Sequence, residues 1–288
     1  GDPHRGGAGR ARRAEPDEER AAPGHRYAGS STRRSRSTPT ASRVCVFPLG
    51  QRIWIDRTAE SPPRPKCSRL SLDDMKPELT VILVNFNDKA HLEACLSSLQ
   101  AGTSKLAAEV ILVDNHSEDG SPELVRTAFP WVRLIRNAEN LGYARANNIG
   151  IRASQGEFIL FLNTDTVVPP EVVPGLVAGL RARPQAGAAG PALVHEDGSF
   201  QVSFGGRRSF FSEIRQKLFI NPYYRTVLRF STKRRQVSWV SGACLLARRA
   251  AVEEAGWFDE NFFLCFEESD LCLRLKERGG TVRWFPWC

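Results

Sequence analysis

Methionine is almost absent from the chain: Met75 is the single one, and it stands directly before the first run of residues typical of a buried strand. The chain starts at Gly1, and residues 1–75 are rich in Arg, Ser, Pro and Gly. We therefore expect Met75 to be the native start and residues 1–74 to be upstream translation or a disordered extension. A genuine disordered basic tail is the alternative. The predicted globular domain covers residues 76–288.

Three further absences narrow the class of protein. No stretch approaches the roughly 20 apolar residues that span a bilayer, and the start lacks the apolar centre of a signal peptide. The seven cysteines (45, 67, 95, 244, 265, 272 and 288) are odd in number and show no CxxC or Cys/His metal spacing. Cys95 and Cys272 fall within helical apolar patterns, so we expect buried thiols and a reducing, cytoplasmic location.

Charge is concentrated in the N-terminal segment. Residues 1–75 contain 15 Lys and Arg against 9 Asp and Glu, a net of +6, whereas residues 76–288 contain 25 and 23, a net of +2. A basic chain would ordinarily suggest nucleic acid or an acidic membrane surface as partner. Because the globular part is nearly neutral, we do not expect nucleic acid to be a partner.

Strand and helix patterns alternate from residue 79 onward. Leu79 to Val84 is a short run typical of a buried parallel strand, and Leu92, Cys95, Leu96 and Leu99 share one helix face. Further strands are predicted at 110–113, 132–135 and 158–162, and helices at 121 onward (N-cap Ser121), 143–153, 170–183, 248–255 and 268–278. Regular structure of unspecified type is predicted at 237–246. The pattern favours an α/β fold with a parallel sheet covered on both faces. Residues 195–237 are irregular, and we expect loops and an acceptor-facing segment there.

Polar residues cluster where the predicted strands end, which is where parallel sheets bind ligands. The first strand ends in Asn85-Phe86-Asn87, the second in Asp114-Asn115, and the fourth in Asn163-Thr164-Asp165. Asp165 could ligate a hard divalent ion, or it could merely cap the following turn. Asp114 could accept hydrogen bonds from a ribose or base, or belong to an ordinary polar turn.

Two other segments carry candidate chemistry. Gly142 could let backbone approach a phosphate at a helix N-terminus, or the segment could be a plain loop before a helix. Glu267-Glu268-Ser269-Asp270 follows the aromatic run 262–266. These acids suit a helix start, but apolar surroundings could also raise a carboxylate pKa and create a general base.

Together, the order and spacing of these segments resemble the family 2 glycosyltransferases, in particular their rhamnosyltransferase-like branch. The resemblance covers roughly residues 79–287 and rests on 81–87 (VILVNFN), 113–121 (VDNHSEDGS), 140–142 (NLG), 162–166 (LNTDT), 239–243 (WVSGA), 256–260 (GWFDE) and 266–274 (FEESDLCLR). It implies a GT-A fold, with a mainly parallel sheet flanked by helices. It also implies a polysaccharide-building enzyme at the inner face of the plasma membrane.

The resemblance also implies roles for single residues. Asp114, with Asn85, Asn87, Asn115 and Gly142, would bind the nucleotide. Asp165 would be the last acid of a DxD-type metal motif that binds Mg²⁺ or Mn²⁺, with Asn163 in place of the first acid. Glu268, preceded by Glu267, would be the catalytic base, which is usually aspartate. Trp239, Gly242, Asn163 and Asp270 would border the donor and acceptor pocket.

The implied reaction moves a sugar from a nucleotide-diphosphate donor, dTDP-rhamnose by analogy, to a hydroxyl of a glycan or lipid-linked acceptor with inversion. We expect Asp114, Asp165 and Glu268 to surround a single cleft. The family usually continues past the last strand and supplies a histidine metal ligand there, and none of the five histidines occupies that place. The domain is therefore expected to be truncated at its C-terminus.

Other functional classes fit less well. A dehydrogenase or methyltransferase would need a glycine-rich turn after the first strand, and residues 85–88 contain no glycine. A sugar nucleotidyltransferase would need a Gly- and Arg-rich first loop. A degenerate, non-catalytic module that binds nucleotide sugars stays open, because truncation and glutamate at position 268 favour it.

Overall fold

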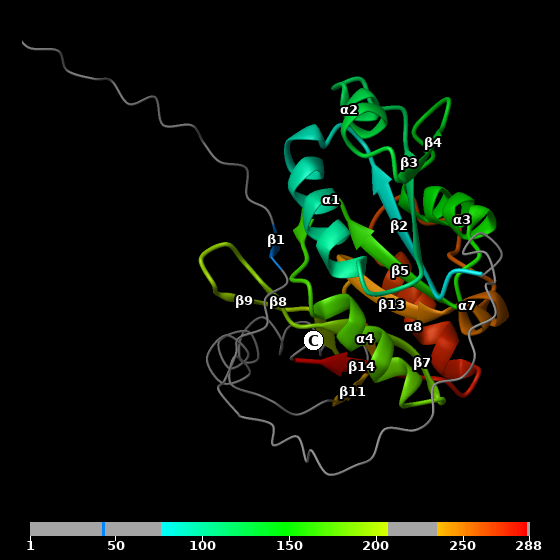
Figure 1. The fold of residues 1–288 in the computed structure, drawn as a ribbon. Coiled ribbons are helices and arrows are strands. Elements are labelled where there is room, and N and C mark those ends of the chain that lie inside the picture. The colour runs from blue at the N-terminus through cyan, green and yellow to red at the C-terminus, as the bar shows by residue number, and fades with distance from the viewer. Residues whose placement is uncertain (1–41, 44–75, 207–234, 287–288) are drawn as a thin grey trace, which may run out of the picture. The chain divides into compact units, whose positions relative to one another are not determined.

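The computed structural model describes residues 42–43, 76–206 and 235–286. Its main feature is an eight-stranded sheet with the order β11-β14-β7-β13-β5-β2-β3-β4 (Figure 1). These strands are Leu79–Asn85 (β2), Ala108–Asp114 (β3), Val132–Arg136 (β4), Phe158–Asn163 (β5), Ala186–Pro191 (β7), Arg235–Val237 (β11), Cys244–Arg248 (β13) and Thr281–Phe285 (β14). Expectations for residues 1–41, 44–75 and 207–234 lie outside the described residues.

The half of the sheet that ends at β4 is entirely parallel. β2 pairs in parallel with β3 on one side and β5 on the other, and β3 pairs in parallel with β4. In this register Asn85 lies beside Asp114, and Val84 beside Asn163. The carboxyl ends of β2, β3 and β5 therefore meet at one edge of the sheet, as expected from the sequence.

The other half of the sheet is mixed. β13 pairs antiparallel with both β5 and β7, and β11 antiparallel with β14, whereas β14 and β7 are parallel. The predicted α/β fold with a mainly parallel sheet is confirmed. The strands β7 and β14 were not predicted, and β7 in particular consists of Ala, Gly and Pro, which carry no strand signal.

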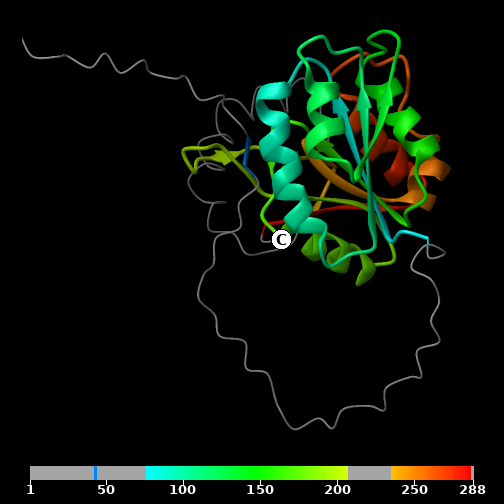
Figure 2. The same ribbon diagram turned by 45° about the horizontal axis from the view of Figure 1, so that its top comes forward.

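Helices cover both faces of the sheet (Figures 1 and 2). Lys89–Thr103 (α1), Ser121–Ala128 (α2) and Val172–Arg181 (α4) pack on one face, and Tyr143–Ala153 (α3), Arg249–Ala255 (α7) and Glu267–Glu277 (α8) pack on the other. Four residues predicted on one helix face, Leu92, Cys95, Leu96 and Leu99, are all fully buried in α1. The helix predictions are confirmed to within a few residues.

The helix predicted from Ser121 onward is observed, but its N-cap lies one residue earlier than predicted. Gly120, with φ of +79°, caps α2, and Ser121 is the first helical residue. Ser121 instead donates a hydrogen bond from its Oγ to Asp119 Oδ1 over 2.6 Å. The left-handed conformation favours glycine over serine at the cap, because glycine lacks a Cβ.

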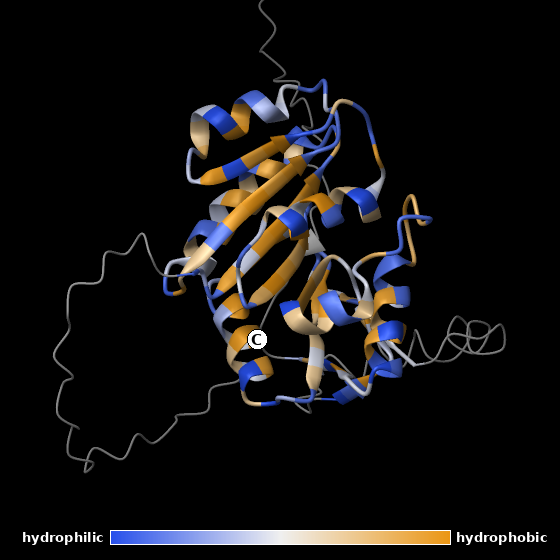
Figure 3. Ribbon diagram, turned by 90° about the vertical axis from the view of Figure 1, so that its right-hand side faces the viewer, coloured by the Kyte–Doolittle hydropathy of each residue, from blue (hydrophilic) through white to orange (hydrophobic). Residues whose placement is uncertain are grey.

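The central strands are apolar on both faces, because each face is covered by helices (Figure 3). In β2, Val81 and Leu83 pack towards α1 and α4, whereas Ile82 packs towards α3. Burial on both sides explains why the sequence of β2 is a continuous apolar run rather than an alternating one. It also fixes the position of the polar residues that follow each strand.

Short strands complete the fold near the start of β13. Ser42–Arg43 (β1), Thr166–Val167 (β6), Leu193–Val194 (β8) and Phe200–Gln201 (β9) form a four-stranded sheet, and Phe204–Gly205 (β10) pairs with Trp239–Val240 (β12). The pairing of β10 with β12 places Gly205 opposite Trp239. The segment 241–243 between β12 and β13 is thereby held beside the start of α8.

Candidate active site

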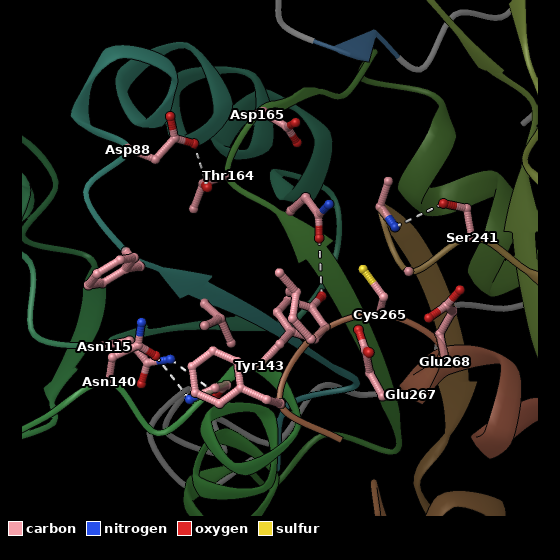
Figure 4. A pocket seen from close by; sticks show the side chains of 18 of the residues that line it. Asp88, Asn115, Asn140, Tyr143, Thr164, Asp165, Ser241, Cys265, Glu267 and Glu268 are labelled. Atoms are coloured by element: carbon pink, nitrogen blue, oxygen red, sulfur yellow. Dashed lines mark hydrogen bonds between the residues drawn. The ribbon is translucent and has the colours of Figure 1, made fainter. Parts of the chain in front are cut away.

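A cleft of about 820 Å³ lies at the carboxyl ends of β2, β3 and β5, next to the start of α8 (Figure 4). Its walls come from six regions of the chain: the end of β2 with the loop into α1, the loop after β3, the loop before α3, the end of β5 with the residues that follow it, and the segments 241–243 and 263–268. Eight residues selected from the sequence line it: Asn87, Asn115, Gly142, Asn163, Asp165, Gly242, Glu267 and Glu268. Four others, Asn85, Asp114, Trp239 and Asp270, do not.

Asp114 and Asn85 lie beneath the cleft. Both are fully buried, and Asn85 Nδ2 donates to Asp114 Oδ1 over 3.0 Å. Asp114 Oδ2 accepts a hydrogen bond from the Ser117 amide, and Arg136 lies 3.5 Å away. The Asp114 carboxylate thus orders the turn that follows β3. Of the three carboxylates expected around one cleft, Asp165 and Glu268 line it, and Asp114 supports its wall.

The polar network continues to Asn115, which is buried, and to Asn87, which is exposed. Asn115 Nδ2 donates to the Gly142 carbonyl over 3.1 Å, and Asn137 donates to Asn115 Oδ1. Asn87 has a φ of +51°, and its Oδ1 accepts a hydrogen bond from the Glu118 amide over 2.8 Å. The loops after β2 and β3 are therefore fixed to each other.

Asp165 occupies an electrostatically unfavourable position. Burial raises the pKa of its carboxyl group, and the neighbouring Asp88 carboxylate raises it further. Asp165 Oδ1 is buried and has no hydrogen-bond partner. A carboxylate in this state would be stabilised by a cation, since opposite charge offsets the cost of desolvation.

A divalent ion fits Asp165, although the chain would supply only part of its ligands. The unpartnered Oδ1 is the hard oxygen donor that Mg²⁺ and Mn²⁺ prefer. Within residues 42–43, 76–206 and 235–286, no group of three or more His, Cys, Asp or Glu could hold a metal ion. The remaining ligands of a bound ion would come from water or from a bound substrate.

Glu267 and Glu268 begin α8 and reach the cleft from the side of the 263–266 loop (Figure 4). Burial raises the pKa of Glu267, which is only 5% exposed, and its Oε2 has no hydrogen-bond partner. Glu268 is more exposed, and Ser269 Oγ lies 3.3 Å from its Oε1. The expectation that apolar surroundings raise a carboxylate pKa in this segment is met at Glu267.

Gly142 makes room for protein backbone at this cleft. With φ of +81°, it caps the N-terminus of α3, and a Cβ built on it would lie 2.7 Å from the carbonyl oxygen of Phe263. The amide of the next residue, Tyr143, donates to that same oxygen over 2.7 Å. Gly142 therefore allows the backbone of the 263–266 loop to come close. The N-terminal end of α3 holds that loop in place through the Tyr143 amide.

Asn163, Gly242, Asp270 and Trp239 have different surroundings. Asn163 Oδ1 accepts a hydrogen bond from the Tyr143 hydroxyl over 3.1 Å, and a Cβ built on Gly242 would lie 3.5 Å from the Cβ of Glu268. Asp270 is paired with Arg274 within α8, with Nε to Oδ2 at 2.8 Å. Trp239 is 8% exposed and packs in the core against Gly205.

The cleft-lining residues that were not selected from the sequence include Asp88, His91 and Tyr143. Asp88 accepts hydrogen bonds from Thr164 Oγ1 and pairs with His91 Nδ1, and His91 Nε2 is buried without a partner. The i,i+3 spacing of Asp88 and His91 at the start of a helix was the available signal. Burial strongly raises the pKa of the Tyr143 phenol, so it stays a hydrogen-bond donor.

Comparison with known proteins gives a consistent result. The family model described as Glycosyl transferase family 2 matches residues 80–256. The N-acetylglucosaminyl-diphospho-decaprenol L-rhamnosyltransferase of Mycobacterium tuberculosis is 33% identical over 235 residues, which cover 74% of this chain and 75% of that protein. The segments carrying the candidate residues from Asn85 to Gly242 lie within the matched family region.

Solved structures share the fold. A mannosyltransferase from Pyrobaculum calidifontis, solved with GDP-Man and Mn²⁺, has a TM-score of 0.54 at 22% identity, covering 74% of this chain and 56% of its own. GalNAc-T7, solved with UDP, GalNAc and Mn²⁺, has a TM-score of 0.55 at 17% identity, covering 74% and 43%. This chain thus spans about half the length of these solved proteins. The likeness confirms the expected GT-A fold.

In the described part of the chain, no helix has the length and apolar character required to cross a membrane.

Proposed function

Because the chain belongs to glycosyltransferase family 2, we propose that it transfers a sugar from a nucleoside-diphosphate donor to a hydroxyl of a lipid-linked glycan, with inversion at the anomeric carbon. The proposed donor is dTDP-rhamnose, since the mycobacterial relative is named as an L-rhamnosyltransferase. The same name motivates an acceptor sugar linked through a diphosphate to a polyprenol. With such an acceptor, the proposed transfer takes place at the cytoplasmic face of a membrane.

One observation carries this proposal: Asp165 and the pair Glu267 and Glu268 come from separate elements and line one cleft of about 820 Å³. A volume of this size is typical of small-molecule sites. The reaction needs one carboxylate that binds a cation and a second that accepts a proton. Asn87, Asn115 and Gly142 line the same cleft and are the proposed contacts of the nucleotide.

In the proposed reaction the acceptor oxygen attacks the anomeric carbon while Glu268 takes the hydroxyl proton. The bond from that carbon to the donor diphosphate breaks, and its electron pair leaves with the diphosphate. A divalent cation held by Asp165 would supply charge stabilisation for the diphosphate. Glu268 is the proposed base because it is the more accessible of the two glutamates. Positioning of the donor and the acceptor in the cleft contributes the rest of the rate enhancement.

The test is a transfer assay with dTDP-rhamnose, an N-acetylglucosaminyl-diphospho-lipid and Mg²⁺ or Mn²⁺. Removing a general base costs on the order of 10²–10⁴ in rate, so Glu268→Gln should lose about that much kcat. Donor binding, followed by the thermal shift that the nucleotide sugar produces, should stay intact. Glu277→Gln, an exposed position at the other end of α8, is the matched control and should be unaffected.

Several outcomes would contradict the assignment. Turnover that persists in Glu268→Gln but falls in Glu267→Gln would make Glu267 the base. A wild-type chain that binds nucleotide sugars yet neither transfers nor hydrolyses any of them would be a non-catalytic module. A thermal-shift screen of other nucleoside-diphosphate sugars, with metal present, would identify a donor other than dTDP-rhamnose.

A further inference from the structure

Large exposed apolar side chains gather at the opening of the cleft. Among the described residues five large hydrophobic side chains are exposed, and four of them line this cleft: Phe86 (48%), Phe263 (60%), Leu264 (65%) and Phe266 (53%). We refer to these four as the apolar rim. Single exposed apolar residues are common on protein surfaces, but a group of them beside a polar site marks an interaction surface.

The rim is held in its exposed position by backbone structure. The Phe263 carbonyl accepts the Tyr143 amide over 2.7 Å, and the Phe266 carbonyl accepts the Asp270 amide over 2.9 Å. Between these bonds, Cys265 and Phe266 both have a φ of +72°, which costs free energy in non-glycine residues. A segment fixed at both ends and strained between them keeps its apolar side chains at the cleft instead of folding them into the core.

From this arrangement we infer that the apolar rim binds the isoprenoid chain of the acceptor, directly beside the sugar that enters the cleft. The inference rests on the proposed function and adds a binding site to it. The polar lining residues Asn115, Asp165 and Glu268 are buried or half-buried, whereas the four apolar rim residues of the same cleft are exposed. This order matches an amphipathic acceptor whose sugar lies in the cleft and whose carbon chain lies on the rim.

The charge around the rim favours a carbon chain over the surface of an anionic bilayer. Of the five acids in residues 259–270, Glu260 is paired with arginines of α3 and Asp270 with Arg274 of α8. Glu267 and Glu268 line the cleft beside the rim, and residues 259–270 contain no Lys or Arg. Anionic lipids attract basic segments and repel acidic ones. An uncharged isoprenoid chain meets no such repulsion and gains about 25 cal/mol for each Å² of apolar surface that it buries.

The experiment compares two acceptors that differ only in chain length: the same N-acetylglucosaminyl diphosphate on a decaprenyl chain or on a short, water-soluble alkyl chain. Phe263→Ser and Leu264→Ser remove rim side chains and leave the backbone bond of residue 263 in place. Leu273→Ser is the matched control, because Leu273 is 45% exposed on α8 and does not line the cleft.

In each rim variant, KM for the decaprenyl acceptor should rise about tenfold, the effect of losing one buried apolar side chain. KM for the short-chain acceptor, KM for the donor and kcat should stay within about twofold of wild type. Leu273→Ser should match wild type with both acceptors. Equal effects on both acceptors, or no effect on either, would overturn the inference.

A binding measurement separates this inference from the proposed function. Farnesyl phosphate, titrated below its micellar concentration, should bind wild type and Leu273→Ser more tightly than the two rim variants. If it does so while no transfer occurs, the proposed function fails and the rim site stands. If the rim variants instead lose binding to acceptor-free phosphatidylglycerol–phosphatidylethanolamine vesicles, with no preference for acceptor chain length, the rim contacts the bilayer and the inference is wrong.

Discussion

At the scale of single residues, the cleft contains two carboxyl groups that folding makes harder to ionise. Burial is the main reason that the pKa values of Asp165 and Glu267 are raised, and each has an oxygen without a hydrogen-bond partner. A buried polar group that is left unsatisfied lowers stability, and natural proteins accept that cost mainly at functional sites. The two residues therefore link the stability of this chain to its chemistry.

Glu267→Gln should make the protein more stable at pH 8 than the wild type. Since the pKa of Glu267 is raised on folding, the folded state holds this proton more tightly than the unfolded state. Stability from this group is fully present below the ordinary glutamate pKa and is lost as pH rises through the raised value. Glutamine has no charge to bury, so the melting temperature should rise at pH 8 and change little at pH 4.

Thermal unfolding of both proteins from pH 4 to pH 8 measures this effect. Exposed Glu277→Gln serves as control and should follow the wild-type curve. A Glu267→Gln protein that is less stable than wild type by the same amount at every pH would show that the carboxylate is not penalised in the folded state.

Eight of the twelve residues selected from the sequence line the cleft, but the sequence did not separate lining residues from supporting ones. Asp165, Glu267 and Glu268 follow apolar runs, so their positions at strand and helix ends could be predicted. Asp114 also ends a strand, yet Asn85 and Ser117 engage its carboxylate beneath the surface. Whether Asp114 lines the cleft or supports it depends on its side-chain partners, and one of them, Asn85, lies more than 25 positions away along the sequence. No local sequence pattern predicts such a contact.

At the scale of elements, the junction between α3 and the 263–266 loop is the contact that completes the cleft. The Tyr143 amide, one of the donors that a helix start leaves unpaired, is satisfied by the Phe263 carbonyl. Gly142 is required at this point for its positive φ and because Phe263 occupies the space of a Cβ. The start of α3 and the approach to α8 are therefore coupled through one backbone contact.

Gly142→Ala should destabilise the protein more than Gly198→Ala does. Both glycines have positive φ, +81° and +76°, but a Cβ on Gly198 would meet nothing within 4 Å. Gly198→Ala should thus cost only the left-handed strain, about 1 kcal/mol. Gly142→Ala adds a backbone clash and should cost about 1–3 kcal/mol more.

Urea unfolding gives the free energy of each variant, and donor-induced thermal shifts report on the cleft. We expect Gly142→Ala also to weaken the thermal shift caused by a nucleotide sugar, because the loop must move. Equal destabilisation by the two substitutions would show that Phe263 yields freely, and the proposed coupling would then be absent.

Elements were predictable where local sequence and tertiary position agree. α3 was predicted with its observed bounds, 143–153, and β2 was predicted from its apolar run. β7 was missed because its sequence, Ala186–Pro191, is made of small residues, and its strand conformation is imposed by pairing with β13 and β14. The Ser121 cap was misplaced because the adjacent Gly120 fits the left-handed position better.

At the scale of the whole molecule, the order of the motifs along the chain was enough to predict the fold class. The antiparallel insertion of β13 between β5 and β7 was not predictable from periodicity, because buried strands of either direction have the same apolar pattern. The buried hydrophobic residues of the described chain run from Leu79 to Phe285, and the family match starts at residue 80. These limits agree with the proposal that residues 76–288 form the functional domain.

A chain that begins at Met75 should therefore fold and bind nucleotide sugar as the full chain does. It keeps every buried hydrophobic residue of the described part, and among the described elements it loses only β1, whose two residues pair with β6 and β8. We expect its melting temperature to lie within about 2 °C of the full chain, which corresponds to less than about 1 kcal/mol for a domain of this size. A chain that begins at Pro39 is the matched control, because it retains β1 and removes residues 1–38. Should the Met75 chain alone aggregate or lose its donor-induced thermal shift, residues 39–74 contribute to the domain, and its proposed boundary at residue 76 is wrong.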